Sequence, residues 1–327
     1  MKFNLSEAEH GSKVVADWDK LVDQSNNGTL FHKLDFLSYH GKRFSEVEKC
    51  LVWRVGEQPF GLMASVLSFQ NGKKTLISPY GASFGGPIFQ RPLKLQEALN
   101  VADALKKFLL DSGIEVCRLT LAPSIYWNVH CEAINFCLEK IGFSIDSRDV
   151  FSVIDLRGKT YESVWSGYQG RARTSIRKSA SLFEIEYDAS IRDFYSILLE
   201  DKTRHRSKPT HTLDELSKLK LSFPDSIKVD IATHKETGGR AAVCYFIPNQ
   251  RAIMTFYMAQ ETHALRLNGL NVLLDLGIQH AVQKKFKYFD FGGSTVGYNV
   301  ENLGISNFKE SFGALCNSRI SYLWNKS

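Results

Sequence analysis

Two glycines, a carboxylate and a lysine lie close together near the C-terminal end of the sequence. Residues 286–295 read Phe-Lys-Tyr-Phe-Asp-Phe-Gly-Gly-Ser-Thr, and residues 307–314 read Asn-Phe-Lys-Glu-Ser-Phe-Gly-Ala. The first segment is typical of a short strand that ends in a glycine turn, where the backbone can adopt φ > 0 and a ligand can approach closely. The second is typical of a short helix that carries Lys309. We predict that they form the floor and one wall of an active site; the alternative is a buried strand and an amphipathic helix.

The carboxylate in the first segment is a candidate general base. Asp290 lies between Phe289 and Phe291, and strand alternation points its carboxyl group away from both rings. Burial would raise the pKa of Asp290, which suits a residue that accepts a proton. The alternative is a salt bridge to a nearby lysine or arginine.

Two histidines are further candidates for proton transfer. His205 and His211 flank the segment 206–210, and either could titrate near neutral pH. Motifs of other chemistries are missing from the sequence: there is no Ser/His/Asp motif, HExxH, paired-cysteine signature or P-loop. We therefore expect no metal site, no covalent intermediate and no ATPase activity.

The composition indicates a globular protein with a mild positive charge. Of 327 residues, 41 are Lys or Arg and 35 are Asp or Glu, which gives a net charge of +6. This excess suits an anionic substrate or cofactor but is smaller than a dedicated nucleic-acid binder would carry. The six cysteines form no CxxC pair and are expected to be reduced. Because no apolar run suits a signal peptide or a membrane span, we expect a cytoplasmic protein.

Periodicity and turn signals predict the same order of elements in both halves. In the first half the predicted helices cover residues 14–24, 31–40, 95–110 and 131–141, and the strands cover 50–55, 60–69, 74–78, 115–122 and 150–155. In the second half the helices cover 192–200, 213–221, 271–284 and the turn around Lys309, and the strands cover 227–233, 241–247, 252–258, 287–291 and 319–324. This order indicates an internal duplication of a mixed α/β unit, in which a helix connects an antiparallel meander to a parallel strand.

Two irregular segments are further candidates for ligand contact. Residues 78–89 contain three glycines and two prolines and must form a shaped loop, in which Tyr80 and Ser83 could contact a ligand; the alternative is a rigid connector. Residues 161–178 contain a compact basic run beside Trp165 and Tyr168. On a helix, Arg173 and Arg177 would share a face and could bind phosphate or carboxylate. The alternative is a solvated helix face.

Four motifs, together with the repeated order of elements, resemble the Fem-type (FemABX, or BioF2-like acyltransferase) branch of tandem Gcn5-related N-acetyltransferase (GNAT) folds. The motifs are Arg171-x-x-x-x-Ile-Arg-Lys178, Pro209-Thr-His-Thr212, Phe289-Asp-Phe-Gly-Gly-Ser294 and Asn307-Phe-Lys-x-x-Phe-Gly313. The resemblance is carried by the second half; the first half matches in layout and in Gly85-Gly86-Pro87. It implies an α/β protein of two GNAT-like domains, each a mixed, mostly antiparallel sheet flanked by helices. We place them at residues 1–158, on the acceptor side, and 159–327, which would bind the donor and carry catalysis.

The resemblance implies an acyltransferase. Fem-type enzymes transfer an aminoacyl group from tRNA to a cell-wall precursor peptide, and looser relatives are taken to use acyl-CoA, often with amino sugars as acceptors. The sequence has no sustained heptads for the coiled-coil arm thought to help with tRNA. We therefore expect acyl-CoA as co-substrate, no tightly bound cofactor, and an amino group of a sugar or cell-envelope precursor as acceptor, as in polysaccharide biosynthesis. The alternatives are an aminoacyl-tRNA-dependent peptidyltransferase acting on a peptidoglycan precursor and a non-catalytic ligand-binding protein.

The resemblance also assigns residues to the donor. GNAT enzymes hold pyrophosphate with an Arg/Gln-x-x-Gly-x-Gly/Ala loop at a helix start, and residues 266–271 read Arg-Leu-Asn-Gly-Leu-Asn. Arg266 and Gly269 match, whereas Asn271 stands where Gly or Ala is usual. Free N–H groups at a helix start favour phosphate; the alternative is N-capping by Asn268. Tyr257 lies on the third strand of the half, where GNAT folds splay and admit the acyl chain.

For catalysis, the resemblance assigns Lys309 to the lysine that stabilises charge at the donor ester in related peptidyltransferases. Direct transfer then needs a base, for which Asp290, His205 and His211 are the candidates. The residues predicted to bind substrate are Phe308, Gly292, Gly293, Ser294, Tyr80, Gly85, Gly86, Arg173 and Arg177.

Overall fold

The structure is a computed structural model that describes residues 3–295, 300 and 302–326. The chain divides into two compact units. The first consists of Met1–Asp149 and Ser318–Ser327, and the second of Val150–Asn317. Each unit is built on parallel and antiparallel strands with helices packed on them, as the sequence predicts.

The first unit is built on the meander that the sequence predicts. Strands β2 (Glu48–Val55), β3 (Gln58–Gln70) and β4 (Lys73–Ser78) pair antiparallel in sequence order. Helix α4 (Leu95–Asp111) then leads to β6 (Val116–Thr120), which pairs parallel to β4. The other elements are β1 (Asn4–Glu7), α1 (Lys13–Ala16), α2 (Trp18–Asp23), α3 (Leu34–Leu37), β5 (Ile88–Phe89), α5 (Ala133–Lys140) and the short 3₁₀ helices η1 (Leu30–His32), η2 (Ser38–Arg43) and η3 (Ser124–Tyr126).

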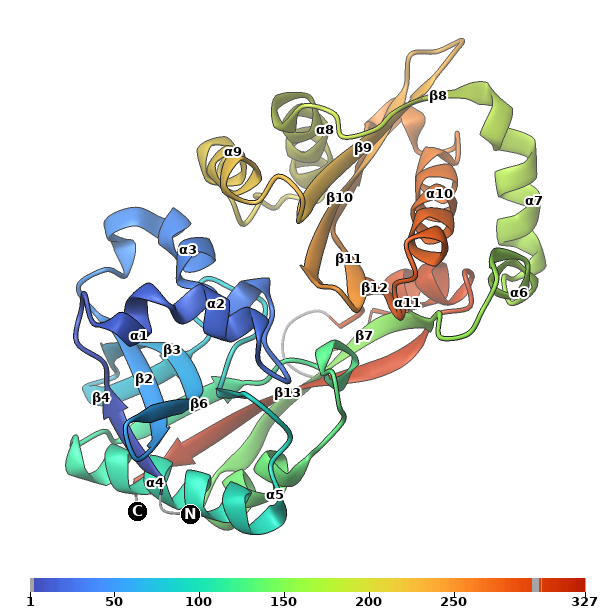
Figure 1. Ribbon diagram of the computed structural model, residues 1–327. Coiled ribbons are helices and arrows are strands. Elements are labelled where there is room, and N and C mark those ends of the chain that lie inside the picture. Colours follow the sequence, from blue (N-terminus) through green and yellow to red (C-terminus); the bar gives the residue numbers. More distant parts are fainter. Residues whose placement is uncertain (1–2, 296–299, 301, 327) are drawn as a thin grey trace. The chain divides into compact units, whose positions relative to one another are not determined.

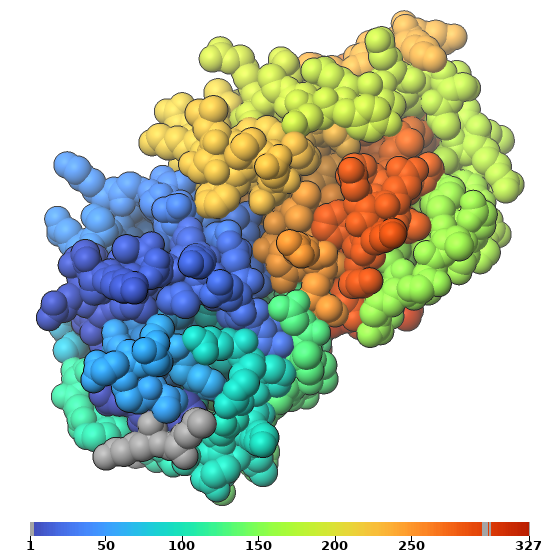
Figure 2. Space-filling model, in the orientation of Figure 1, coloured from blue at the N-terminus to red at the C-terminus, as the bar shows by residue number. Residues whose placement is uncertain are grey.

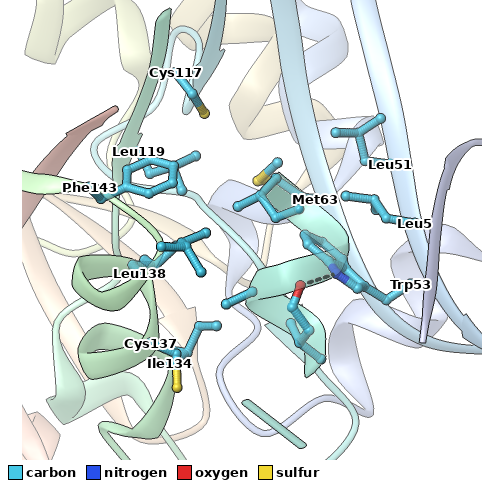
Figure 3. Close-up of a cluster of buried hydrophobic side chains, with 14 of the residues drawn as sticks. Leu5, Leu51, Trp53, Met63, Cys117, Leu119, Ile134, Cys137, Leu138 and Phe143 are labelled. Carbon is cyan, nitrogen blue, oxygen red and sulfur yellow. Dashed lines mark hydrogen bonds between the residues drawn. The ribbon is translucent and has the colours of Figure 1, made fainter. Parts of the chain in front are cut away.

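Helices α4 and α5 cover one face of this sheet and close its core. Side chains of β2, β3 and β6 meet those of the two helices, as Figure 3 shows for Leu51, Met63, Leu119 and Leu138. The indole N–H of Trp53 donates a 3.1 Å hydrogen bond to the carbonyl oxygen of Val101 in α4, so this polar group is satisfied within the core.

The second unit repeats the arrangement. Strands β9 (Ile227–His234), β10 (Arg240–Asn249) and β11 (Ala252–Gln260) form an antiparallel meander. Helix α10 (Gly269–Gln283) leads to β12 (Tyr288–Gly293), which pairs parallel to β11. The other elements are α6 (Tyr161–Ser166), α7 (Gly170–Ser179), β8 (Phe183–Glu186), α8 (Ile191–Arg204), α9 (Leu213–Ser222), α11 (Leu303–Glu310) and the 3₁₀ helices η4 (Ala180–Leu182) and η5 (Thr262–Ala264).

Helices cover both faces of the second sheet. Helices α8 and α9 lie on one side, and α10 lies on the other with α6 and α7 beside it (Figure 1). The space-filling view shows the outer surface of α10 next to that of the segment containing α6 and α7 (Figure 2). Phe289 and Phe291 pack into the core under α10, so strand alternation directs Asp290 to the opposite face, as predicted.

The observed division of the chain differs from the predicted one, because the last strand of each half pairs outside its own half. Residues 151–155 of β7 (Ser144–Asp155) pair with β12, and residues 321–325 of β13 (Leu315–Asn325) pair with β6. The units therefore divide after Asp149 and not after residue 158, and residues 318–327 belong with the first unit. The acceptor and donor roles of the two halves stay predictions.

Among the described residues, no helix combines the length and the apolar character needed to cross a bilayer.

Candidate active site

The parallel pairing of β11 with β12 stops midway along both strands. Their register pairs Ala252 with Tyr288, Ile253 with Phe289 and Met254 with Asp290, and no later pair follows within the described parts of these strands. Strand β11 nevertheless continues to Gln260 and β12 to Gly293. We call the point beyond the last pair the fork. Strand edges beyond a fork keep backbone donors and acceptors that a ligand can use.

The side chain of Asp290 turns the backbone away at the fork. Its Oδ1 accepts a 2.7 Å hydrogen bond from the backbone N–H of Gly292, two residues along, which is a local turn of the kind that Asp favours. Gly292 has φ +73°, a left-handed conformation that costs glycine little. A Cβ atom on Gly292 would lie 3.3 Å from the carbonyl oxygen of Thr255. The Phe-Gly-Gly sequence therefore matches a sharp bend in β12.

Lys309 reaches this bend from α11. Asn302 caps the helix by accepting a 3.1 Å hydrogen bond from the N–H of Ile305, and Lys309 is the buried residue of α11, only 1% exposed. Its Nζ donates to the carbonyl oxygens of Gly292, at 3.0 Å, and Gly293, at 2.5 Å. A third, longer contact of 3.3 Å joins Nζ to the Oγ of Ser294. The structure thus brings together Lys309, the glycine pair and Ser294.

Burial shifts the protonation of this lysine. Desolvation lowers the pKa of Lys309 from 10.5 to about 8, and the charge of Asp290 acts in the opposite direction. The difference corresponds to about 3 kcal/mol of disfavoured charge. Asp290 is itself fully buried, so a cation and a carboxylate share a site from which water is excluded. Such a buried ammonium interacts strongly with any negative charge that develops beside it.

A serine pair supports the far side of the site. The Oγ of Ser294 lies 2.7 Å from the Oγ of Ser152 on β7, and both side chains are buried. The backbone N–H of Ser294 also donates to the carbonyl oxygen of Val150. Sequence reasoning missed Ser152, because only the pairing of β7 with β12 places it here.

The two candidate histidines have different surroundings. His211 is 5% exposed, and its Nδ1 lies 2.7 Å from the hydroxyl of Tyr257, another predicted site residue. Burial raises the pKa of Tyr257 to about 12, so its hydroxyl stays protonated at neutral pH. His205 is exposed at the C-terminal end of α8, where it lies 3.3 Å from the Nη2 of Arg204. The structure therefore pairs His211 with Tyr257 and leaves His205 apart from that pair.

The start of α10 is not capped by a side chain. Asn268 occupies the N-cap position with φ +64°, but its side chain makes no capping hydrogen bond, and its Nδ2 donates to the Oγ of Ser179 at 3.3 Å. Gly269 is required by packing, because a Cβ there would lie 2.8 Å from the Cβ of Ala241. Arg266 is exposed just before the helix. The predicted pyrophosphate loop is thus a helix start with an arginine nearby.

The predicted basic strip lies on a helix, but its arginines have internal partners. The Nη1 of Arg173 donates to the carbonyl oxygens of Ser166, at 3.0 Å, and Tyr168, at 2.7 Å, and so supports the end of α6. The guanidinium of Arg177 lies 5.5 Å from the ring centroid of Trp165. Both side chains therefore tie α7 to the α6 segment.

The remaining predicted residues pack within their own units. Phe308 contacts the Phe312 ring and the core of the second unit. Tyr80 is buried and donates to Glu48. The N–H of Gly85 donates to the carbonyl oxygen of Thr120, and Gly86, at φ +79°, leaves 2.5 Å between its Cβ position and Leu121.

Among residues 3–295, 300 and 302–326, no group of three or more His, Cys, Asp or Glu side chains could hold a metal ion.

Comparison with solved structures identifies the fold. The chain is similar to the structure titled FemX over 100% of its length and 98% of that chain, with a TM-score of 0.71 and 9% identity. The chain is also similar to the structure titled L-PGS from Bacillus licheniformis over 98% of its length and 93% of that chain (TM-score 0.59, 11% identity). A tandem GNAT protein from the clavulanic acid biosynthesis pathway matches over 99% and 98% (TM-score 0.54, 10% identity). No protein-family model matches the sequence, and no curated protein does.

These similarities cover both units at low sequence identity, so they define the fold. The chain has a Fem-like tandem GNAT fold, which confirms the resemblance and the fold class predicted from the four motifs and the repeated order of elements.

Proposed function

We propose that this chain is an N-acyltransferase that moves an acyl group from acyl-CoA directly to an amino group of a sugar or cell-envelope precursor. The observation that carries the proposal is the buried ammonium of Lys309 at the bend of β12, beside the fork between β11 and β12. Together they offer an edge for an extended donor and a cation for the developing oxyanion.

The contacts of Lys309 suit this role. Attack of the amine on the thioester carbon forms a tetrahedral oxyanion, which collapses with release of the CoA thiolate. Two carbonyl oxygens hold Nζ in place, and the 3.3 Å contact with Ser294 is the weakest of the three. An oxyanion would replace that contact, since Ser294 keeps its bond to Ser152.

The amine must also lose a proton. The pair of His211 and Tyr257 is the best candidate relay, because the two groups are buried and already hydrogen-bonded. Asp290 is better suited to shaping the turn and balancing the charge of Lys309, because its Oδ1 accepts the N–H of Gly292. We therefore propose His211 as the general base.

Three features support CoA as the carrier. The start of α10 has no side-chain cap, Arg266 is exposed beside it, and the chain has a net charge of +6. N–H groups at a helix start and a nearby arginine favour a pyrophosphate.

Binding of acyl-CoA can be tested by thermal shift and calorimetry with acetyl-, succinyl- and longer-chain acyl-CoAs. A ligand present at 100 times its Kd should stabilise the protein by about 2.7 kcal/mol. Arg266→Ala should weaken binding, whereas Arg43→Ala, an exposed arginine of the first unit, should not. No shift with any acyl-CoA would contradict the proposal.

The second candidate is an aminoacyl-tRNA-dependent transferase, which the similarity to FemX favours. The same Lys309 would then face the ester of the aminoacyl-tRNA. This candidate predicts retention of tRNA at low salt that weakens steeply as salt rises. Absence of retention at low salt would exclude it, and mass spectrometry of a co-purified ligand would separate the two donors directly.

A further inference from the structure

At the fork, Thr255 carries a buried hydroxyl that has no hydrogen-bond partner among the described residues. It follows Met254, the last residue of β11 that pairs with β12. The residue is 4% exposed, and its Oγ1 makes no hydrogen bond in the part of the chain that the structure describes. An unpaired buried hydroxyl destabilises a fold, and a valine has nearly the same shape without that cost. A threonine here therefore suggests that something else supplies the partner.

The neighbours of Thr255 place its hydroxyl on the side of the sheet that α10 covers. Thr255 pairs with Tyr245 across β10, and cross-strand partners share a face. Tyr245 belongs to the core under α10, where its hydroxyl donates to the carbonyl oxygen of Leu273. The main chain of β11 is also irregular here, since Cys244 pairs with Tyr257 and leaves Phe256 as an extra residue.

The backbone of Thr255 also lies beside the bend that Lys309 supports. Its carbonyl oxygen lies 3.3 Å from the Cβ position of Gly292, and the carbonyl oxygen of Gly292 accepts from the Nζ of Lys309 at 3.0 Å. Gly292 therefore lies between the backbone of Thr255 and the ammonium group of Lys309. A donor seated with its reacting carbonyl at Lys309 would extend past Thr255.

We infer that the Thr255 hydroxyl is a specificity determinant for the acyl donor, hydrogen-bonding a carbonyl, amide or hydroxyl group of the donor at the fork. The inference rests on the proposed function and names the class of donor, which is an acyl donor with a polar atom beside the Thr255 hydroxyl. A purely hydrocarbon group there would leave the hydroxyl unpaired, and a site built to pair with a polar group rejects analogues that lack one.

The test compares Thr255→Val and Thr255→Ser with the unaltered protein, using butyryl-CoA and 3-hydroxybutyryl-CoA as matched donors. Thr255→Val should keep or raise the Tm while weakening donor binding about tenfold. Thr255→Ser should bind within about threefold of the unaltered protein, because it retains the hydroxyl. Equal losses for both donors assign the bond to a carbonyl or amide, and a loss confined to the hydroxylated donor assigns it to the acyl substituent.

Ser147 provides the matched control. Its hydroxyl is also buried and without a partner among the described residues, but it lies on β7 in the first unit. Ser147→Ala should leave donor binding unchanged. The inference is overturned if Thr255→Val binds both donors as tightly as the unaltered protein. If the unaltered protein binds neither acyl-CoA, the proposed function fails instead, and the role of Thr255 fails with it.

Discussion

The two units end their parallel ladders in different ways. In the first, β4 pairs with β6 from Thr75 to Ser78, and the loop after β4 returns to the same strand, where Gly85 bridges to Leu121. In the second, β11 pairs with β12 only as far as Met254, and the chain leaves β11 through η5 directly into α10. In the described residues, the loop after β4 thus continues the pairing beside β6, whereas the register of β11 with β12 ends at Met254 and Asp290.

The glycine pairs that we predicted to bind ligand also have different neighbours in the two units. Gly85 and Gly86 let a loop pack closely against β6, whereas Gly292 and Gly293 present carbonyl oxygens to Lys309. Glycine pairs therefore serve close packing in one unit and hold a buried cation in the other. The comparison favours the second unit as the place of the proposed chemistry, and the following predictions test that proposal.

Removal of the buried cation should have the largest effect. Lys309→Met should lower kcat/KM about 100- to 1,000-fold, because a preorganised group facing the oxyanion is lost. Acyl-donor binding and the circular-dichroism spectrum should be retained. Lys140→Met is the matched control, since Lys140 is the exposed lysine at the end of α5 in the first unit. Equal activity of the two variants would contradict the assignment.

The pH dependence should reveal the charge state of Lys309. If the ammonium stabilises the oxyanion, kcat/KM should fall about tenfold per pH unit above pH 8, the pKa of the buried lysine. A rate that rises through pH 8 would instead identify Lys309 as a base.

The same shift predicts a signature in stability. Lys309 has a pKa of about 8 in the folded protein and near 10.5 in the unfolded chain, so the unfolded chain binds more protons between these values. The free energy of unfolding should therefore rise with pH from about 8 to about 10.5, as denaturation at several pH values would measure. Lys309→Met should lack this contribution.

Asp290 should act through Lys309 and the turn. Asp290→Asn keeps an oxygen for the N–H of Gly292 but removes the charge that raises the Lys309 pKa. We expect about tenfold lower activity at pH 7.5 and an alkaline loss of activity that begins at lower pH. Asp290→Ala should in addition reduce the Tm, because the N–H of Gly292 loses its partner. An unchanged pH profile in Asp290→Asn would contradict this account.

The smallest effect on activity is expected from the packed glycine of the first unit. Gly86→Ala should reduce the free energy of unfolding by about 1–3 kcal/mol, because φ is +79° and Leu121 is too close. Activity per folded molecule should be unchanged. Gly72→Ala separates the two causes, since Gly72 has φ +76° with nothing within 4 Å of the Cβ position. A loss of activity in Gly86→Ala would indicate that the loop binds substrate.

The sequence by itself determined the repeated order of elements and pointed to Lys309 as the main candidate site residue. Hydrophobic periodicity located α4 and α10, and apolar runs bounded by turn signals located the strands of the two meanders. The short strands β1 and β8 were not predicted, since four residues are too few for a recognisable period. The glycine pair and Lys309 were found because glycine and lysine have unusual conformational and electrostatic properties that a local pattern reveals.

Only the tertiary structure decided which residues meet. Strand β7 pairs with β12 and β13 pairs with β6, so the last strand of each half pairs with a strand of the other half. No local signal in either strand specifies its partner. That pairing brings Ser152 to Ser294. Packing in the second unit likewise buries the Thr255 hydroxyl where no described residue is its hydrogen-bond partner. Burial, which shifts the pKa of Lys309, is likewise a property of the packed chain, because desolvation depends on every neighbour that excludes water.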